Sequence, residues 1–285
     1  DVLVVGGGPA GIVASTTIAR SGHTVLLVEK QLALGGKVAS FPCMATTRCR
    51  RCSACLVEDE VAMTLACPEL RVVRGATVAG ASRDSRGIHL TLEPVMNPSG
   101  KENPSHGCRL LKTITVSTRA VILCTGYDVY DAHEKPYLGH GRLRGVTTTL
   151  ELDAILAGSG DDGWLVRGTP PGRVAFVQCV GSRESREGRG YCSQVCCSVA
   201  LRLAGKLLHL HPEAQITIYY IDLQLASRNI RAYAHELSNH KRLRFVQGVP
   251  GEIVQGPGGD LEVRHEAEDE GGPTFTSYDR VVLSV

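Results

Sequence analysis

The chain has 285 residues, enough for two domains that each bury a sizeable core. Its formal net charge is +2, with 43% hydrophobic and 21% charged residues, which is ordinary for a globular protein. This balance gives no reason to expect nucleic-acid binding, and no apolar run is long enough for direct membrane insertion. Eleven cysteines, an odd number without a visible secretion signal, argue against a disulfide framework and favour metal or redox chemistry in a cytoplasmic protein.

The first thirty residues, DVLVVGGGPAGIVASTTIARSGHTVLLVEK, predict a strand, a glycine turn, a helix and a second strand. The apolar run Val2–Val5 has the length and composition of a buried parallel strand. An apolar stripe at helical spacing follows, and Gly22 ends the helix. Val25–Val28 is the second strand.

The glycines of this first turn have the spacing of a dinucleotide-binding motif. Gly6, Gly8 and Gly11 form G-x-G-x-x-G between a strand and a helix, where they allow a tight turn, close approach of a pyrophosphate and close helix–strand contact. The helix N-terminus presents N–H groups to the phosphates, and a carboxylate at the end of the second strand can bind a ribose. The expected binding residues are Gly6, Gly8, Pro9, Ala10, Gly11, Glu29 and Lys30.

Two later stretches favour FAD over NAD. GGK (35–37) follows the second strand closely, and CTG (124–126) ends a later strand. Together with GGGPAG these resemble the FAD domain of thioredoxin-reductase-like flavoproteins. The resemblance implies FAD contacts from Gly35, Gly36, Lys37, Val78, Thr125 and Gly126, with the main chain of Val78 meeting the adenine. An ordinary solvated surface position is an equally good interpretation of Lys37.

The remaining pattern predicts two tandem Rossmann-like α/β domains, and the resemblance implies that they are of the thioredoxin-reductase type. The first, residues 1–165, contains in chain order a Cys-rich loop (43–67), strands with a hairpin (70–95), a polar excursion (97–107) and a buried strand (120–127), and a linker (131–172) spans the boundary. The second, residues 166–285, contains a strand from Arg173, a helix (193–210), a strand (215–223) and alternating strands and turns to VVLSV. The apolar stripe expected on this helix consists of Val195, Val199, Leu203, Leu207 and Leu210. We expect the natural protein to extend beyond both ends.

The stretch FVQCVGSRESREGRGYCSQVCC (176–197) places four cysteines where the second domain would normally bind a nicotinamide dinucleotide. Gly181 is present, but G-x-G-x-x-G is not. Zinc prefers cysteine pairs two to four residues apart, and adjacent cysteines bind one ion awkwardly, whereas on a cubane each thiolate binds a different iron. Inert buried thiols are the remaining alternative. The four candidate ligands are Cys179, Cys192, Cys196 and Cys197.

VAFVQCVGSRE followed by YCSQVCC is similar to the A-type component of heterodisulfide reductase, a flavin–iron–sulfur protein of methanogens and many bacteria. YLGHGRLRGVTTTLELDAILAGSG (137–160) resembles the stretch that precedes these cysteines in that family, and the resemblance runs from VVGGGPAG to DRVVLSV. It implies FAD in the first domain and a [4Fe–4S] cluster on the four cysteines of the second, in place of NAD(P)H. It also implies B- and C-type heterodisulfide reductase subunits as partners, and a homodimer.

The larger methanogen form carries a ferredoxin-like insertion, with C-x2-C-x2-C-x3-C-P runs, and an extra N-terminal domain. Neither is visible in this sequence, and the polar residues 97–107 lie near the place of the insertion. The chain therefore resembles the compact bacterial form. Electron bifurcation, which is attributed to the larger form, is not implied.

A second cysteine group, in CRRCSACLVEDEVAMTLACP, has the C-x2-C-x2-C spacing of iron–sulfur ligands. Its candidate ligands to a second cluster are Cys49, Cys52, Cys55 and Cys67. The rival interpretation is a redox disulfide beside the flavin, but Cys43 and Cys49 are spaced C-x5-C and miss the C-x4-C pattern of glutathione-reductase relatives. Cys108 and Cys124 are expected to be structural.

No Ser–His–Asp set or carboxylate pair is evident, so the chemistry is expected on the cofactors. The leading hypothesis is an oxidoreductase: an electron-transferring FAD/[4Fe–4S] component of a heterodisulfide-reductase-like complex. The alternatives are an NAD(P)H-dependent flavin disulfide oxidoreductase and a scaffold without electron transfer.

Overall fold

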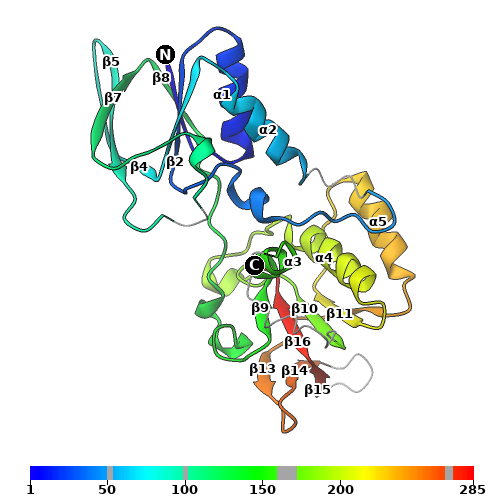
Figure 1. The fold of residues 1–285 in the computed structure, drawn as a ribbon. Helices are drawn as coiled ribbons and strands as arrows, with labels where there is room; N and C mark the ends of the chain where they lie inside the picture. The colour runs from blue at the N-terminus through cyan, green and yellow to red at the C-terminus, as the bar shows by residue number, and fades with distance from the viewer. Residues whose placement is uncertain (50–53, 99–101, 159–171, 267–271) are drawn as a thin grey trace. The chain divides into compact units, whose positions relative to one another are not determined.

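The computed structural model describes residues 1–49, 54–98, 102–158, 172–266 and 272–285 (Figure 1). The chain forms two compact units, the first from Asp1–Cys43 with Cys52–Asp128 and the second from Met44–Arg51 with Val129–Val285. Met44–Arg51 thus comes from the middle of the first unit's sequence but belongs to the second unit.

Unit 1 is built on a parallel sheet with strand order β6-β3-β2-β1-β8 and a three-stranded antiparallel sheet, β4-β5-β7. Its strands are β1 (Val2–Val5), β2 (Val25–Glu29), β3 (Leu70–Arg74), β4 (Ala76–Asp84), β5 (Gly87–Pro94), β6 (Cys108–Arg109), β7 (Ile114–Thr118) and β8 (Ala120–Leu123). Its helices are α1 (Pro9–Arg20), α2 (Leu56–Leu65) and the 3-10 helices η1 (Gly36–Ser40) and η2 (Pro104–His106).

Unit 2 repeats this plan, with a parallel sheet β12-β11-β10-β16-β9 and an antiparallel sheet β13-β14-β15. Its strands are β9 (Val146–Thr148), β10 (Arg173–Val177), β11 (Gln215–Tyr220), β12 (Leu243–Gln247), β13 (Glu252–Gln255), β14 (Leu261–Glu266), β15 (Pro273–Tyr278) and β16 (Arg280–Leu283). Its helices are α3 (Thr149–Leu156), α4 (Cys196–Leu210), α5 (Arg228–Ser238) and the 3-10 helices η3 (Ala132–Glu134), η4 (Pro136–Leu138) and η5 (Ser185–Glu187).

The two parallel sheets share one strand order, in which β10, β11, β12 and β16 take the places of β1, β2, β3 and β8. Strands β1 and β10 each have parallel neighbours on both sides, and such strands are apolar on both faces. The sequence order of strand, turn, helix and strand dictates this crossover in both units. The predicted tandem Rossmann-like fold is confirmed.

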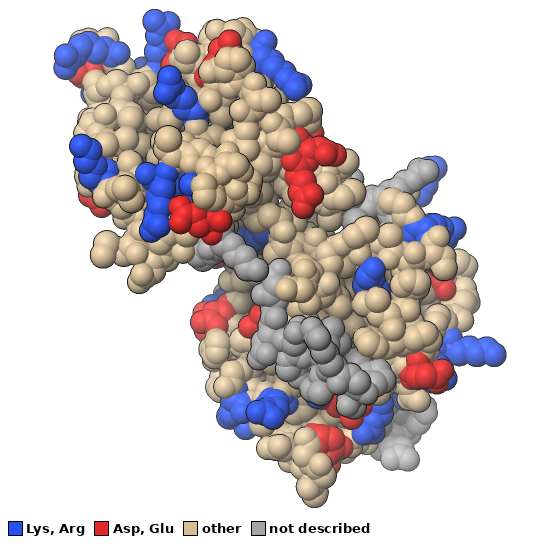
Figure 2. All heavy atoms as spheres, viewed as in Figure 1, with Lys and Arg blue, Asp and Glu red and all other residues tan. Residues whose placement is uncertain are grey.

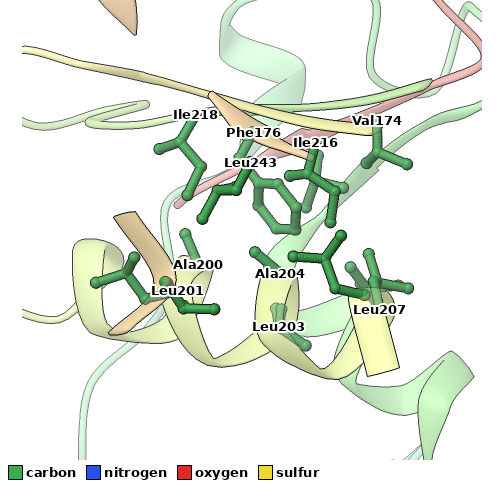
Figure 3. Close-up of a cluster of buried hydrophobic side chains, with 14 of the residues drawn as sticks. Val174, Phe176, Ala200, Leu201, Leu203, Ala204, Leu207, Ile216, Ile218 and Leu243 are labelled. Atoms are coloured by element: carbon green, nitrogen blue, oxygen red, sulfur yellow. The ribbon is translucent and has the colours of Figure 1, made fainter. Parts of the chain in front are cut away.

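One of the two large buried clusters of unit 2 lies between β10, β11 and α4. Phe176 and Ile216 point from the sheet toward Ala200, Ala204 and other residues of α4 (Figure 3). The two alanines let the helix approach the sheet closely, because they add little volume between them. Met44, which is only 2% exposed, is part of the same cluster.

Helix α4 corrects two details of the predicted helix. It begins at Cys196 rather than at residue 193. Val195 and Leu210, which the predicted stripe included, are about half exposed, while Ala200, Leu203 and Leu207 are fully buried. The stripe was drawn through the large residues alone, whereas the packed face also uses small ones.

The strand predicted at 120–127 is present but shorter and less buried than expected, and the described part of the predicted linker at 131–172 is not a linker. Strand β8 ends at Leu123 and pairs only with β1 in the described sheet, and Leu123 is 73% exposed. The described part of the linker is folded: β9 pairs with β16, and α3 packs beside α4. The division of the chain after Asp128 therefore differs from the expected boundary at 165, because the start of the linker belongs to unit 2.

The surface agrees with the near-neutral composition. Figure 2 shows basic and acidic side chains interspersed on the visible face of each unit. Among the helices that the structure describes, none has both the length and the apolar character that crossing a membrane requires.

Candidate cofactor site

The glycine turn, residues 6–11, joins β1 to α1 in unit 1. Gly6 has φ +105°, and a Cβ there would lie 2.2 Å from the carbonyl oxygen of Cys124. A Cβ at Gly11 would lie 1.8 Å from the carbonyl oxygen of Gly6. Both positions therefore require glycine for packing within the protein, as the motif predicts.

Gly8 is different, because no atom of the protein lies within 4 Å of the place where its Cβ would be. It precedes α1, and no side chain caps the first N–H groups of that helix. Open space beside uncapped N–H groups is what a pyrophosphate needs at a helix N-terminus. Packing within the protein explains glycine at positions 6 and 11 but not at Gly8. A bound dinucleotide would explain glycine there, so the turn fits a dinucleotide.

Glu29 lies at the end of β2 and is buried. Its carboxylate accepts hydrogen bonds from the backbone N–H groups of Gly7 and Gln31. A carboxylate has about four lone-pair positions, so acceptor capacity remains for ribose hydroxyls. The side chain is therefore held beside the glycine turn, as expected.

The GGK stretch lies against the same turn. The N–H of Gly35 donates to the carbonyl oxygen of Gly7 at 2.8 Å, and a Cβ on Gly36 would lie 3.1 Å from the Cα of Gly8. Lys37 donates to the carbonyl oxygen of Tyr127 and lies 4.6 Å from the centre of its ring. Stretches some ninety residues apart, at 35–37 and 124–127, therefore converge on the turn.

The other expected FAD residues are placed as follows. Pro9, Ala10 and Lys30 are exposed, the first two at the start of α1. Thr125 and Gly126 lie two and three residues after the end of β8, and Gly126 has φ +70° with no atom within 4 Å of its Cβ position. Val78 packs on a core cluster with Leu3 and Val28, so its contact with adenine stays a prediction.

The corresponding turn of unit 2, the cysteine turn (residues 178–195), joins β10 to α4. Cys179, together with Cys196 and Cys197 at the start of α4, forms a buried cluster with apolar neighbours from the segment after β11. Cys192 is half-buried, and its Sγ accepts a hydrogen bond from the N–H of Gln194 at 3.3 Å. Three of the four predicted ligands are thus together.

Backbone strain marks the cysteine turn. Among the described residues, positive φ outside glycine occurs at Cys179, Arg183 and Gln194, with values of 61°, 61° and 62°. A residue with a side chain adopts this conformation rarely and at a cost of about 1–3 kcal/mol, so it persists where the surroundings impose it. Strain of this kind gathers at functional sites.

The thiol group of Cys196 is the easiest of the three to ionise. Hydrogen bonds from Cys179 and Cys197 hold its pKa well below the usual value. The same hydrogen bonds, together with burial, raise the pKa of Cys179 and Cys197. Binding a metal centre through all three would therefore release protons, as thiolate ligation generally does.

An ion pair lies just beyond the end of β11 in unit 2. Asp222 lies two residues after the end of β11, whereas Glu29 is the last residue of β2, and the carboxylate of Asp222 is bound by the guanidinium of Arg183. This contact lowers the pKa of Asp222. The sequence interpretation missed this pair, although an acidic residue after the second strand was the available signal.

A second network, also missed, holds the cysteine turn from outside. The ammonium group of Lys135, 4% exposed, lies 2.6 Å from Glu184 Oε2 and 2.5 Å from Glu187 Oε1. Burial disfavours the charged ammonium, but these hydrogen bonds outweigh it and raise the pKa of Lys135. A Cβ on Gly181 would meet the ring of Tyr130 at 2.1 Å. No sequence motif indicates either contact.

The donor set of the cysteine turn suits an iron–sulfur cluster, because three buried thiols converge at the start of a helix. Within the described residues, however, no three His, Cys, Asp or Glu side chains are arranged to hold a single metal ion. Of the predicted second set, Cys52 lies outside the described residues. Cys49 belongs to unit 2, while Cys55 and Cys67 belong to unit 1.

Comparison with known proteins gives a family match over the part of the chain that contains the glycine turn. Residues 1–59 match the family of FAD dependent oxidoreductases. The whole chain is 28% identical to the A component of the ferredoxin/F420H2-dependent CoB-CoM heterodisulfide reductase of Methanosarcina acetivorans, covering 44% of that protein. A stretch of 60% of the chain is 36% identical to the A component of the H2:CoB-CoM heterodisulfide,ferredoxin reductase of Methanothermobacter thermautotrophicus, covering 27% of it.

The chain therefore spans less than half the length of these relatives. The alignment with the M. acetivorans protein is 350 positions long, whereas this chain has 285 residues. The relative thus has additional residues inside the matched region, as an insertion would produce.

Solved structures share the fold. Thioredoxin reductase of T. acidophilum superposes with a TM-score of 0.60 at 18% identity, covering all of this chain and 76% of that enzyme. An NAD-dependent persulfide reductase from A. fulgidus gives 0.55 at 14% identity, covering all of this chain and 45% of that protein. These likenesses confirm the thioredoxin-reductase type of fold. The predicted resemblance to the A components of heterodisulfide reductases, which are oxidoreductases by name, is likewise confirmed, and it extends over the whole chain.

Proposed function

We propose that this chain is the electron-transferring FAD and [4Fe–4S] part of a heterodisulfide-reductase-like complex. The observation that carries the proposal is the buried trio Cys179, Cys196 and Cys197, which lies where the second Rossmann-like unit would otherwise bind a nicotinamide dinucleotide. With Cys192 these residues would hold the cluster. Bound FAD and the cluster would supply the redox chemistry, and the protein positions them and tunes their potentials.

In unit 1 the glycine turn and its neighbours would hold FAD. Gly8 would leave space for the pyrophosphate, Glu29 would accept hydrogen bonds from the ribose hydroxyl groups, and Gly35–Gly36 would line the extended cofactor. Lys37 would approach the flavin. The FAD dependent oxidoreductase match over residues 1–59 supports this assignment.

Unit 2 is poorly suited to NADH or NADPH. The glycine motif is missing from the cysteine turn, and the carboxylate of Asp222 is bound by Arg183. The acidic residue nearest the end of β11 is therefore already engaged by a cation of the protein. The main alternative, an NAD(P)H-dependent flavin disulfide oxidoreductase, is therefore disfavoured, although solved structures of that general type share the fold.

The names of the relatives, which are all A components of larger reductases, support a multi-protein assembly. We propose B- and C-type subunits and a second copy of this chain as partners. A second cluster on Cys49, Cys52, Cys55 and Cys67 is part of the same proposal, for which the C-x2-C-x2-C spacing is the support. Buried thiols suit a reducing compartment, so we propose a cytoplasmic location.

The decisive experiment is reduction of the purified, FAD-loaded protein without partners under anaerobic conditions. Flavin absorbance is followed after addition of NADH, of NADPH, or of a low-potential one-electron donor. We expect slow or no bleaching with either nucleotide and fast bleaching with the one-electron donor. Rapid, stoichiometric reduction by a nucleotide would reject the relay and favour the disulfide oxidoreductase.

Iron and acid-labile sulfide, measured on the same anaerobic sample, count the clusters. About four irons per chain indicate one cubane, and about eight indicate two. Protein without iron that still binds FAD would reject the cluster assignment. Loaded protein that no donor reduces would favour a scaffold.

A further inference from the structure

A short segment outside the predicted binding motifs, residues 102–107, lies against the loop that leads to the GGK stretch. The N–H of Leu34 donates to Nδ1 of His106 at 3.1 Å, and the N–H of Asn103 donates to the carbonyl oxygen of Leu32 at 3.4 Å. Nε2 of His106 lies 2.8 Å from the side-chain amide of Asn103. Two backbone groups of the loop are thus satisfied from this segment.

Arg74, at the end of β3, joins the same segment to the same loop. It is 3% exposed and donates to the carbonyl oxygens of Leu32 and Gly107, each at 2.9 Å. It also lies 3.4 Å from the carboxylate of Glu102. The guanidinium therefore fixes residues 102–107 relative to residues 31–34 through hydrogen bonds on both sides.

Gly107 allows this close approach. Its φ is +103°, and a Cβ would lie 2.6 Å from the carbonyl oxygen of Val72. A larger residue would push the segment away from β3 and move His106 away from Leu34. The location of the segment is therefore built into the sequence.

The loop that His106 contacts is short and leads directly to the glycine turn. Glu29 precedes it, and Gly35 and Gly36, which contact Gly7 and Gly8, follow it. Leu34 itself is buried, so its N–H needs an acceptor inside the protein. A shift of Leu34 would move the next two residues, which touch the turn.

We propose that His106 is a positioning residue for FAD, which holds Gly35–Gly36 against the glycine turn through the N–H of Leu34. The inference rests on the proposed FAD site. His106 acts with Nδ1 unprotonated, since that atom accepts a hydrogen bond. Burial, and next the charge of Arg74, lower the pKa of His106 and so favour the neutral ring.

The test is FAD affinity of flavin-free protein, titrated with FAD and followed by flavin fluorescence. Replacing His106 by Ala should weaken binding about tenfold, because a buried N–H loses its acceptor. His106→Asn should restore affinity to within about threefold of wild type, since its side-chain oxygen can lie near the place of Nδ1. His106→Gln, whose oxygen lies one bond further out, should bind as weakly as His106→Ala. His23→Ala, an exposed histidine of the same unit, is the matched control.

The outcomes separate this inference from the proposed function. Wild-type protein that binds no FAD would reject the cofactor assignment itself. Wild-type binding with equal affinity in His106→Ala would overturn the positioning role. If His106→Ala does not fold, the Asn and Gln variants decide, because equal affinities in these two would overturn the role of the Nδ1 acceptor.

Discussion

The glycine turn and the cysteine turn occupy equivalent places in two similar sheets, yet one is built from glycines and the other carries cysteines. Each follows the first strand of a parallel βαβ unit and leads into a helix, at the carboxyl edge where ligands of such folds bind. The glycine turn leaves open space at Gly8. The cysteine turn fills the place with buried thiols and is strained at Cys179.

The difference shows how one scaffold supports two kinds of site. A turn that admits a large phosphate group needs open space beside its backbone, which side chains would fill. Glycine leaves that space and also adopts the turn's conformation without strain. In a turn whose side chains must converge on one point, the backbone is strained and other residues have to hold it in place. The ion pairs of Lys135 and Arg183 do this for the cysteine turn. The fold is shared, whereas the chemistry lies in the residues placed on it.

The largest expected effect is on the glycine turn. Gly8→Val should abolish FAD binding, with a loss of more than about a hundredfold, because the side chain would fill the space of the pyrophosphate. The fold should survive, since no protein atom lies within 4 Å of the new Cβ. Fluorescence titration and thermal melting of the flavin-free protein measure the two effects. Gly251→Val, also in open space but in unit 2, is the control, and normal flavin content in Gly8→Val would show that FAD binds elsewhere.

The matching change in the cysteine turn is Cys197→Ser. It should remove or destabilise the cluster and leave FAD bound, because Cys197 and the glycine turn belong to different units. Iron content and the visible spectrum report the first effect, and flavin stoichiometry reports the second. Cys108→Ser, which changes an exposed cysteine, should keep its iron. Full iron content in Cys197→Ser would remove this residue from the ligand set.

A smaller effect is expected from the support of the cysteine turn. Lys135→Met should lower the free energy of unfolding of unit 2 by about 2 kcal/mol, because Glu184 and Glu187 would lose their shared partner. Denaturant unfolding followed by circular dichroism measures the change, and the exposed Lys241→Met serves as the reference. The variant should also lose iron faster in the presence of a chelator. An unchanged rate of iron loss would separate this network from the cluster.

The smallest effect concerns the anchoring of α4. Asp153 of α3 binds Arg202 of α4, and burial, which outweighs the guanidinium, raises the pKa of Asp153 to about 6. A carboxyl group that holds its proton more tightly when folded contributes stability below about pH 4, and this contribution is lost as the pH rises through 6. The free energy of unfolding of wild type, minus that of Asp153→Asn, should therefore decrease by about 1–2 kcal/mol between about pH 4 and pH 6. A constant difference would mean that the pKa is unshifted.

Local patterns predicted most of both turns. The glycine spacing places Gly6, Gly8 and Gly11 correctly because the turn itself imposes the spacing within a few residues of chain. The spacing of the cysteines likewise indicates their convergence, since Cys196 and Cys197 open a helix whose sheet partner ends just before Cys179. Motifs of this kind encode short-range geometry, which a sequence displays directly.

Long-range contacts were beyond such patterns. Strand β9 pairs with β16, which lies more than a hundred residues later in the chain. Lys135 donates hydrogen bonds to Glu184 and Glu187, about fifty residues away. Neither pairing leaves a periodic signal, so the segment was interpreted as a linker. The support of Leu34 by His106 was missed for the same reason, because a polar stretch gives no sign of which backbone group it satisfies.

The segment Met44–Arg51 has a consequence for the order of folding. Met44 packs in the core that α4 helps to form, and Lys206 of α4 donates to the carbonyl oxygen of Ala45 at 2.9 Å. On a ribosome Met44 emerges well before α4 has been synthesised, so this apolar side chain must wait for its partners. Unit 1 can therefore fold as the chain emerges only if it leaves this segment aside, and a fragment beginning at Val129 would lack one side chain of its own core.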